Sequence, residues 1–225
     1  MIMMSLLSAA VPSGGTRTLT GTASKGQGPV PSHPLAGGGS MPMMIMGGND
    51  YAGWFKAAGK GAGIQTFYSY GNGRHIAPQL KSAGRENVFV SSGIPCGCCG
   101  PDSVKKMNAS LAMNYINKEL SELDTTYVDL LLVHHRCTTD IETASLWSAF
   151  EAAKAAGKAR HIGVSNFNAH DLATLGEVAK EPIEALEAHF GVGAYGTHTH
   201  AHSGRPQDWT DASRRLSHGH RCNGL

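Results

Sequence analysis

Short apolar runs alternate with longer stretches of helical periodicity through most of the chain, from about residue 41 to residue 189. The runs rich in β-branched and aliphatic residues predict strands at residues 64–67, 87–92, 127–133, 160–165 and 183–188. The run at 128–133 is apolar on both faces apart from Asp129, which is typical of a strand buried in a parallel sheet. This alternation predicts βαβ units and a parallel α/β fold, either a barrel or a doubly wound layer.

The stretches between these runs carry recognisable helix ends. Pro101 and Asp102 suit the first turn of a helix, because proline lacks the N–H that would be unpaired there and aspartate favours the positive end of the helix dipole. Asp140 is the predicted cap of the next helix, and Gly157 suits the left-handed residue that follows its end. The apolar residues that the two helices would bury are Leu111, Tyr115, Leu120 and Leu123 in the first, and Trp147, Phe150 and Ala153 in the second.

The two ends of the chain differ from this central part. Residues 1–49 have Arg17 and Lys25 as their only charges and are rich in serine and threonine, a composition that suits either a disordered leader or an organelle transit peptide. Residues 191–225 contain five of the twelve histidines and lose both helical and strand periodicity. We therefore predict a leader at 1–36, a folded domain at 37–190 and an irregular His-rich tail at 191–225.

Composition and charge narrow the classes of partner. Hydrophobic residues make up 41% of the chain and charged residues 16%, which is an ordinary globular balance. The formal net charge of +2 comes without a cluster of lysine and arginine, so we expect no nucleic-acid partner. No apolar run approaches the ~20 residues of a membrane-spanning helix, so we expect no membrane partner. The predicted location is cytoplasmic, or a plastid or mitochondrion if the leader is a transit peptide.

The five cysteines do not form the evenly spaced framework of a disulfide-rich protein, so we expect reduced thiols in an intracellular compartment. The alternative is a zinc site with ligands from Cys96, Cys98, Cys99, His198, His200 and His202. Structural zinc sites usually use two separated pairs of cysteines, and this cluster lacks that spacing. We therefore predict no metal site.

Six segments resemble the first six strands of the aldo-keto reductase family, in the order and at the spacings of that family. They are Met41 with Pro42 and the Gly-rich stretch after them, which resemble the entry into the first strand, and residues 63–72, 85–92, 127–134, 160–167 and 182–189. The segment RHIGVSNF at 160–167 is similar to the family's signature around its fifth strand. The resemblance implies a (β/α)8 barrel of TIM-barrel type, here incomplete, with about six strands and truncated after the sixth. Open sheet edges expose unpaired backbone groups, so we expect an oligomer that covers them.

The resemblance also implies a reaction and its residues. Family members reduce carbonyls by hydride transfer from a nicotinamide, while a tyrosine protonates the developing alkoxide and a histidine orients the carbonyl. The tyrosine aligns with Tyr70, which Asn72 follows at the family's spacing, and the histidine aligns with His134. Ser165 and Asn166 match the residues that hydrogen-bond the nicotinamide carboxamide. The implied activity is that of an oxidoreductase that uses NADP(H) to reduce a small-molecule carbonyl to an alcohol.

Two partners of the tyrosine are replaced in this chain. The family holds a lysine beside the tyrosine, oriented by an aspartate, and this cation lowers the phenol pKa from its ordinary value of about 10. Gln65 stands at the aspartate position and Gly93 at the lysine position. We therefore expect weak catalysis, and restoring the pair by Gln65→Asp with Gly93→Lys is predicted to raise the rate. An inward-folding Arg74 or Lys81 is the alternative source of a cation.

Cofactor recognition departs from the family as well. Glu184 and Ala185 stand where the family's sixth strand has an asparagine–glutamine pair. The basic segment that grips the adenosine phosphates has no counterpart, so NADP(H) is expected to bind weakly or not at all. Two functions remain open. One is an aldo-keto reductase with low activity, and the other is a catalytically silent relative, either a binding or regulatory protein or a truncated gene product.

Overall fold

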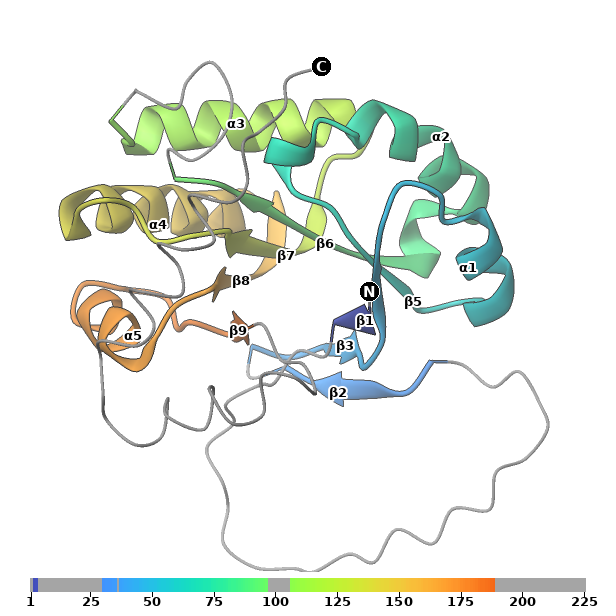
Figure 1. The fold of residues 1–225 in the computed structure, drawn as a ribbon, viewed down its shortest axis with the longest axis horizontal. Helices are drawn as coiled ribbons and strands as arrows, with labels where there is room; N and C mark the ends of the chain where they lie inside the picture. The colour runs from blue at the N-terminus through green and yellow to red at the C-terminus, as the bar shows by residue number, and fades with distance from the viewer. Residues whose placement is uncertain (1, 4–29, 36, 97–105, 189–225) are drawn as a thin grey trace, which may run out of the picture.

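Six successive strands of the chain run parallel and form one curled sheet (Figure 1). The computed structural model describes residues 2–3, 30–35, 37–96 and 106–188. The strands of this sheet, in order across it, are β1 Ile2–Met3, β4 Ile45–Gly47, β5 Ala62–Gln65, β6 Val88–Ile94, β7 Val128–Val133, β8 Ala159–Ser165 and β9 Ala185–Glu187. β1 is antiparallel to β4, and every later pair is parallel. The predicted parallel α/β fold is confirmed.

Helices lie along the outer side of the curled sheet (Figure 1). In the described residues they are α1 Ala52–Ala58, α2 Gly73–Ala83, α3 Ala109–Glu122, α4 Asp140–Ala155 and α5 Ala169–Gly176, with short 3₁₀ turns η1 Tyr68–Tyr70 and η2 Arg85–Asn87. Each α-helix follows one strand and returns the chain to the next, because parallel neighbours need a crossover connection. The carboxyl ends of the six parallel strands therefore meet at one end of the sheet.

A hairpin of β2 (Ser32–Pro34) and β3 (Ser40–Pro42) packs against the inner face of the sheet. Leu35 and Met41 from this hairpin join a buried cluster with Leu130 and Leu132 of β7. Both β1 and β2 precede residue 37, where the folded domain was expected to begin. The described fold thus includes two short strands from the predicted leader, whereas residues 4–29 and the predicted tail lie outside the described residues.

β7 separates two buried clusters, because side chains alternate between the two faces of a strand. Leu131 and Val133 pack in the outer cluster that includes helix residues, and Leu130 and Leu132 pack in the inner cluster. All six residues of β7 are buried, as the doubly apolar pattern predicts. The same alternation points one set of strand-end side chains into the barrel interior, where a site can form.

Asp129, the charged residue of β7, has a structural role. Its carboxylate accepts hydrogen bonds from Arg85 at 2.9 Å, Arg160 at 2.8 Å and the backbone N–H of Val90 at 3.0 Å. Both guanidinium groups lie over the ring of Tyr127, at 4.1 and 4.2 Å from its centroid, which adds cation–π attraction. This cluster joins the starting halves of β6, β7 and β8, away from the strand ends that carry the predicted site.

Two helix starts differ from the sequence predictions. α3 begins directly after Asn108, whose side chain accepts a hydrogen bond from the first turn, rather than at Pro101. Residues 101–105 lie outside the described residues. α4 is capped by Thr139 instead of Asp140, because Thr139 and Glu142 form a reciprocal capping box. Aspartate in the first turn still favours the helix dipole.

The end of β5 differs from the sequence prediction, whereas the end of α4 agrees with it. β5 ends at Gln65, two residues before the predicted end at 67, because the chain leaves the sheet and turns through η1. Phe67 is consequently a loop residue, although its side chain is buried. Gly157 has the left-handed backbone that was predicted, with a φ of 71°. The N–H groups of Gly157 and Lys158 bond back to the last turn of α4, as in a Schellman motif.

The loops that follow β6 and β7 are joined by a disulfide between Cys96 and Cys137. Their Cα atoms lie 4.9 Å apart, within the range for bonded cysteines. The expectation of reduced thiols is therefore wrong for this pair, which is close in space only because β6 and β7 are neighbours in the sheet. The other five residues of the alternative zinc site lie outside the described residues.

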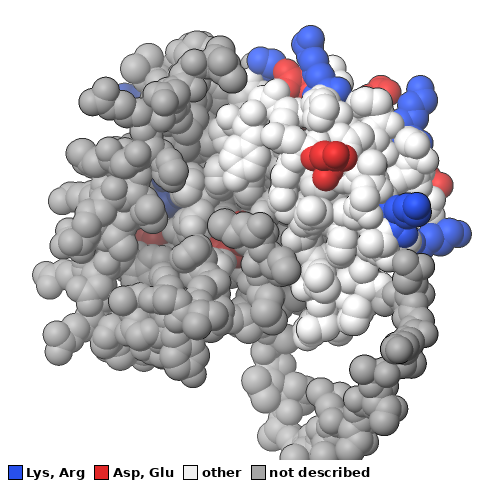
Figure 2. Space-filling model, turned by 45° about the vertical axis from the view of Figure 1, so that its right-hand side comes forward, with Lys and Arg blue, Asp and Glu red and all other residues white. Residues whose placement is uncertain are grey.

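The described surface carries charges of both signs. On the face shown in Figure 2, lysines and arginines are scattered among acidic residues, with broad uncharged surface between them. None of the described helices combines the length and the apolar character that crossing a membrane requires. The absence of a nucleic-acid partner, the cellular location and the oligomer stay predictions.

Candidate active site

The four predicted site residues lie at the carboxyl ends of three strands. Tyr70 ends the turn η1 that follows β5, and His134 comes directly after β7. Ser165 is the last residue of β8, and Asn166 follows it. We call this end of the sheet, defined by these four residues, the mouth. Barrel enzymes place their chemistry at this end.

The structure brings the rings of Tyr70 and His134 together. Their centroids lie 5.9 Å apart with the planes at 88°, an edge-to-face contact. Phe67 stacks on His134 at 3.8 Å and meets Tyr70 edge-on at 5.3 Å. Tyr70 is 56% exposed, so its ring is accessible from solvent while the other two rings hold its inner side.

His134 is a neutral imidazole near neutral pH. Burial, together with the neighbouring ring of His135, lowers the pKa of His134 to about 3. A neutral imidazole has one N–H donor and one acceptor nitrogen. Ser69 Oγ lies 3.5 Å from Nδ1. In the tautomer in which Nδ1 accepts from Ser69, Nε2 carries the proton and is a hydrogen-bond donor.

Asn166 is fixed between the ends of β7, β8 and β9. Its backbone has a left-handed φ of 60°, which asparagine tolerates better than most residues. Its N–H donates to the carbonyl of Glu187 at 2.9 Å. Its Nδ2 donates to the carbonyl of His134 and to Ser165 Oγ, both at 3.0 Å. The exposed amide of Asn166 is therefore held in one orientation at the mouth.

Gln65 and Gly93 lie below the mouth at the inward positions of β5 and β6. Gln65 is buried, and its Nε2 donates to the carboxyl group of Glu187. A Cβ atom on Gly93 would lie 2.5 Å from two ring carbons of Phe67 and 2.6 Å from the carbonyl oxygen of Leu132. The ring of Phe67 thus fills the space that a lysine side chain at position 93 would need.

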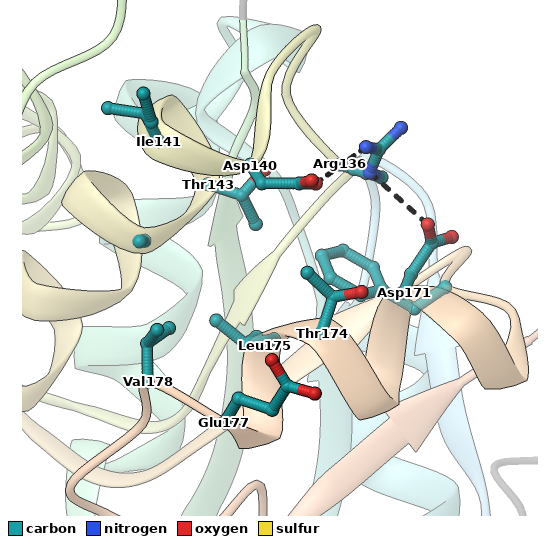
Figure 3. A pocket seen from close by; sticks show the side chains of 11 residues that line it. Arg136, Asp140, Ile141, Thr143, Asp171, Thr174, Leu175, Glu177 and Val178 are labelled. Atoms are coloured by element: carbon teal, nitrogen blue, oxygen red, sulfur yellow. Dashed lines mark hydrogen bonds and ion pairs between the residues drawn. The ribbon is translucent and has the colours of Figure 1, made fainter.

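The alternative cations are exposed to solvent and are not folded inward. Arg74 and Lys81 lie on α2 with exposed side chains, so the alternative of an inward-folding cation is wrong for both. Arg136, two residues after His134, is held by ion pairs to Asp140 at 2.6 Å and Asp171 at 3.2 Å (Figure 3). Its charge is therefore already compensated on the outer layer.

Arg136 also borders a pocket of about 200 Å³ between the start of α4 and the length of α5 (Figure 3). Phe167, Leu175 and Val178 supply apolar lining, and Asp140 lies at its edge. The pocket opens between helices on the outer layer, whereas the predicted site faces the barrel interior. We assign it no part in the chemistry of the mouth.

Glu184 and Ala185 do not supply an amide pair for a cofactor. Glu184 is buried, 2.6 Å from His161 Nδ1 and 2.9 Å from Lys154 Nζ. Burial alone would raise the pKa of Glu184, but its contacts with His161 and Lys154 outweigh burial and lower it. Ala185 belongs to the inner cluster. Both positions therefore contribute to the structure of the barrel.

Three residues of the mouth region were not singled out from the sequence: Phe67, Ser91 and Glu187. Ser91 Oγ is buried without a hydrogen-bond partner among the described residues, and Ser91 is the cross-strand neighbour of Gln65. Glu187 is 5% exposed at the end of β9. A glutamate two residues after an inward alanine in a buried strand was the one available signal for it. Phe67 and Ser91 have no sequence signal of their own.

Comparison with known proteins gives a consistent result. Residues 66–193 match the sequence profile of the Aldo/keto reductase family. The chain is 33% identical over 141 residues to Aldo-keto reductase family 4 member C11 of Arabidopsis thaliana, covering 53% of this chain and 42% of that protein. It is 26% identical over 148 residues to an uncharacterized oxidoreductase, C8E4.04, of Schizosaccharomyces pombe, covering 56% and 43%. The chain thus spans about two fifths of these curated relatives.

Solved structures agree with the fold. An aldo/keto reductase from Brucella melitensis superposes with a TM-score of 0.61 at 25% identity, over 72% of this chain and 63% of that one. MGS-M4, an aldo-keto reductase from a deep-sea metagenome library, gives 0.59 at 28% identity, over 71% and 57%. The Bombyx mori aldo-keto reductase in complex with NADP gives 0.56 at 20% identity, over 72% and 59%, a likeness of fold alone. The predicted partial TIM-type barrel is confirmed, and the chain belongs to the aldo/keto reductase family.

Proposed function

We propose that the mouth is an oxidoreductase site that binds NADP(H) and reduces a small carbonyl compound to an alcohol at a low rate. The contact between the rings of Tyr70 and His134 carries this proposal, because it brings a phenol and a neutral imidazole to one accessible place. Family membership supports the general class of oxidoreductase. The substrate class, the cofactor and the low rate are proposals for this chain.

The mouth offers an acceptor group that fits a nicotinamide. Both N–H groups of the Asn166 side chain are bonded within the chain, so its Oδ1 is the atom that can accept a hydrogen bond from the NH₂ group of the carboxamide. Asn166 is exposed and held in one orientation by His134 and Ser165. The cofactor, when bound, supplies the hydride. The residues of this chain bind it, orient the carbonyl and provide the proton.

Two side chains act on the carbonyl in this proposal. Nε2 of neutral His134 donates a hydrogen bond to the carbonyl oxygen and orients it. The Tyr70 hydroxyl gives its proton to the same oxygen as negative charge develops there. No cation occupies position 93 to favour this transfer. Losing one positioned electrostatic group typically costs roughly 10²–10³-fold in rate, which is why the expected activity is low.

A fluorescence titration with NADPH tests the binding half of the proposal. We expect weak but saturable binding, and we expect Asn166→Ala to weaken it at least ~10-fold, since loss of one good hydrogen bond to a ligand is worth about 1.4 kcal/mol. Asn117→Ala is the matched control, because Asn117 is an exposed asparagine on the outer helix α3. The same weakening in both variants, or no saturable binding at all, would instead favour a silent relative.

A further inference from the structure

A hydrogen bond crosses the barrel interior below the mouth. Gln65 ends β5 and Glu187 ends β9, and the sheet order puts β6, β7 and β8 between them. The amide of Gln65 nevertheless donates directly to the carboxyl group of Glu187, across 122 residues of sequence. The curl of the sheet brings these two strand ends together, and this contact joins β5 to β9 across the interior.

The carboxyl group of Glu187 is buried without an ion pair among the described residues. Its partners are the Gln65 amide and the Ser165 hydroxyl, whose Oγ donates to Oε1 at 3.3 Å. The basic side chains beside β9, the imidazole of His161 and the ammonium group of Lys154, contact Glu184 instead. Burial raises the pKa of Glu187, against the opposing effect of its two hydrogen bonds. Neutral donors therefore take the place of a cation here.

A chain of hydrogen bonds leads from this carboxyl group to the surface of the mouth. Glu187 holds Ser165, Ser165 accepts from the amide of Asn166, and that amide also bonds the carbonyl of His134. Because a hydroxyl has one proton to donate, the bond to Glu187 fixes the rotamer of Ser165 as an acceptor for Asn166. The carboxyl group of Glu187 thus determines the orientation of the exposed Asn166 amide.

The glutamine at position 65 and the glycine at position 93 depend on each other. Without a lysine at 93, an aspartate at 65 would face Glu187 as a second buried carboxyl group with no cation nearby, which is costly. A glutamine provides an N–H donor on a side chain one methylene longer, and no charge. Phe67 fills the remaining space beside Gly93.

We propose that Glu187 is a positioning residue of the mouth, which Gln65 anchors across the interior and which, through the buried Ser165 hydroxyl, orients the Asn166 amide for the cofactor. The identity of the ligand as a cofactor rests on the proposed function. The orienting role itself can be tested on the chain alone.

The first experiment follows the side-chain amide resonances of Gln65 and Asn166 by NMR as the pH changes, without cofactor. Gln65→Glu and Asn166→Asp assign them by loss of signal. Because the pKa of Glu187 is raised, we expect both amides to shift in one shared transition above pH 4.5, the ordinary glutamate value. The transition should vanish in Glu187→Gln. It should persist in the matched control Glu119→Gln. This variant removes another buried glutamate that accepts a hydrogen bond from a serine, on the outer side of β6.

NMR is preferred to unfolding measurements for this purpose. When the pKa of a carboxyl group is higher in the folded chain than in the unfolded chain, the free energy of unfolding falls as the pH rises through that range. Burial raises the pKa of Glu119 to about 7, so Glu119 contributes a slope of the same sign as Glu187. The amide resonances separate the two groups, whereas the stability of the whole chain does not.

The second experiment measures NADPH affinity in a set of exchanges. We expect Glu187→Gln to weaken binding about 10-fold, as for the loss of one oriented hydrogen bond, and Glu119→Gln to leave it unchanged. Gln65→Glu should also weaken binding, because it places two carboxyl groups face to face. The exchange Gln65→Glu with Glu187→Gln restores one amide and one carboxyl group, and should recover part of the loss.

The outcomes separate the two proposals. Two NMR results would overturn the positioning role. One is an Asn166 resonance that does not shift in the transition shown by the Gln65 resonance, and the other is a transition that is still present in Glu187→Gln. A double exchange no better than the worse single variant would overturn it as well. If the shared transition is present but the unmodified chain does not bind NADPH, the proposed function fails and the orienting role of Glu187 stands.

Discussion

Replacing Gly93 by lysine is expected to destabilise the chain by at least about 3 kcal/mol and not to restore a catalytic cation. The first atom of the new side chain would lie within 2.6 Å of the Leu132 carbonyl oxygen and 2.5 Å of the Phe67 ring. The carbonyl belongs to the neighbouring strand in register with Gly93 and cannot withdraw without breaking the sheet. Overpacking costs about 1–3 kcal/mol, and an ammonium group forced into the interior adds to that.

This result would reverse the expectation drawn from the family pattern, in which Gln65→Asp with Gly93→Lys raises the rate. The measurement is urea unfolding of Gly93→Lys and of Gly93→Ala, which isolates the Cβ atom. Gly176→Ala is the matched control, because Gly176 ends α5 with open space around it. We expect that control to be neutral or stabilising by up to about 1 kcal/mol. A Gly93→Lys variant as stable as the unmodified chain would show that Phe67 can leave this space.

Reduction of the disulfide between Cys96 and Cys137 is expected to lower the free energy of unfolding by about 4 kcal/mol. The two cysteines are 41 residues apart. In the chain-entropy account, a cross-link that closes a loop of that length lowers the entropy of the unfolded chain, which raises the free energy of unfolding by about 4 kcal/mol. For a chain of this size, such a change corresponds to roughly 10 °C in Tm. Thermal unfolding with and without a dithiol reductant measures it.

The variant with both Cys96→Ser and Cys137→Ser provides the control. It should unfold at the lower temperature in both conditions, because no cross-link remains to be reduced. Peptide mapping without reductant should recover one fragment that contains both cysteines. Recovery of the two cysteines on separate fragments would mean that the loops after β6 and β7 are not cross-linked.

The strands could be predicted from the sequence because burial on both faces leaves a strong signal. The run at 128–133 is apolar throughout except for Asp129, and the structure buries all six residues. Boundaries were harder, because competing local signals are equally good. Pro101 and Asn108 can each open a helix, and the described part of α3 begins after Asn108. Phe67 has the apolar character of a strand residue, yet the turn at η1 removes it from the sheet.

The candidate site was accessible from the sequence only where a family pattern fixes the spacing. Tyr70 and His134 were named in this way, and the structure places their rings in contact. Glu187 and Phe67 were not, because what they do depends on contacts with Gln65, Gly93 and His134 that only the curl of the sheet creates. The pairing of Cys96 with Cys137 has the same origin. Contacts between distant segments leave no periodic trace in a single sequence.

The most direct test of the proposed site is the rate of aldehyde reduction at saturating NADPH, with protein in excess over the aldehyde, in the unmodified chain and in Tyr70→Phe. The proposal predicts slow cofactor oxidation by the unmodified chain, above the protein-free background. It predicts a fall of about 10²-fold or more in Tyr70→Phe, because the phenol that supplies the proton is removed. Equal rates in the two proteins, or no oxidation above background, would contradict the proposed site and leave the chain as a silent relative of the family.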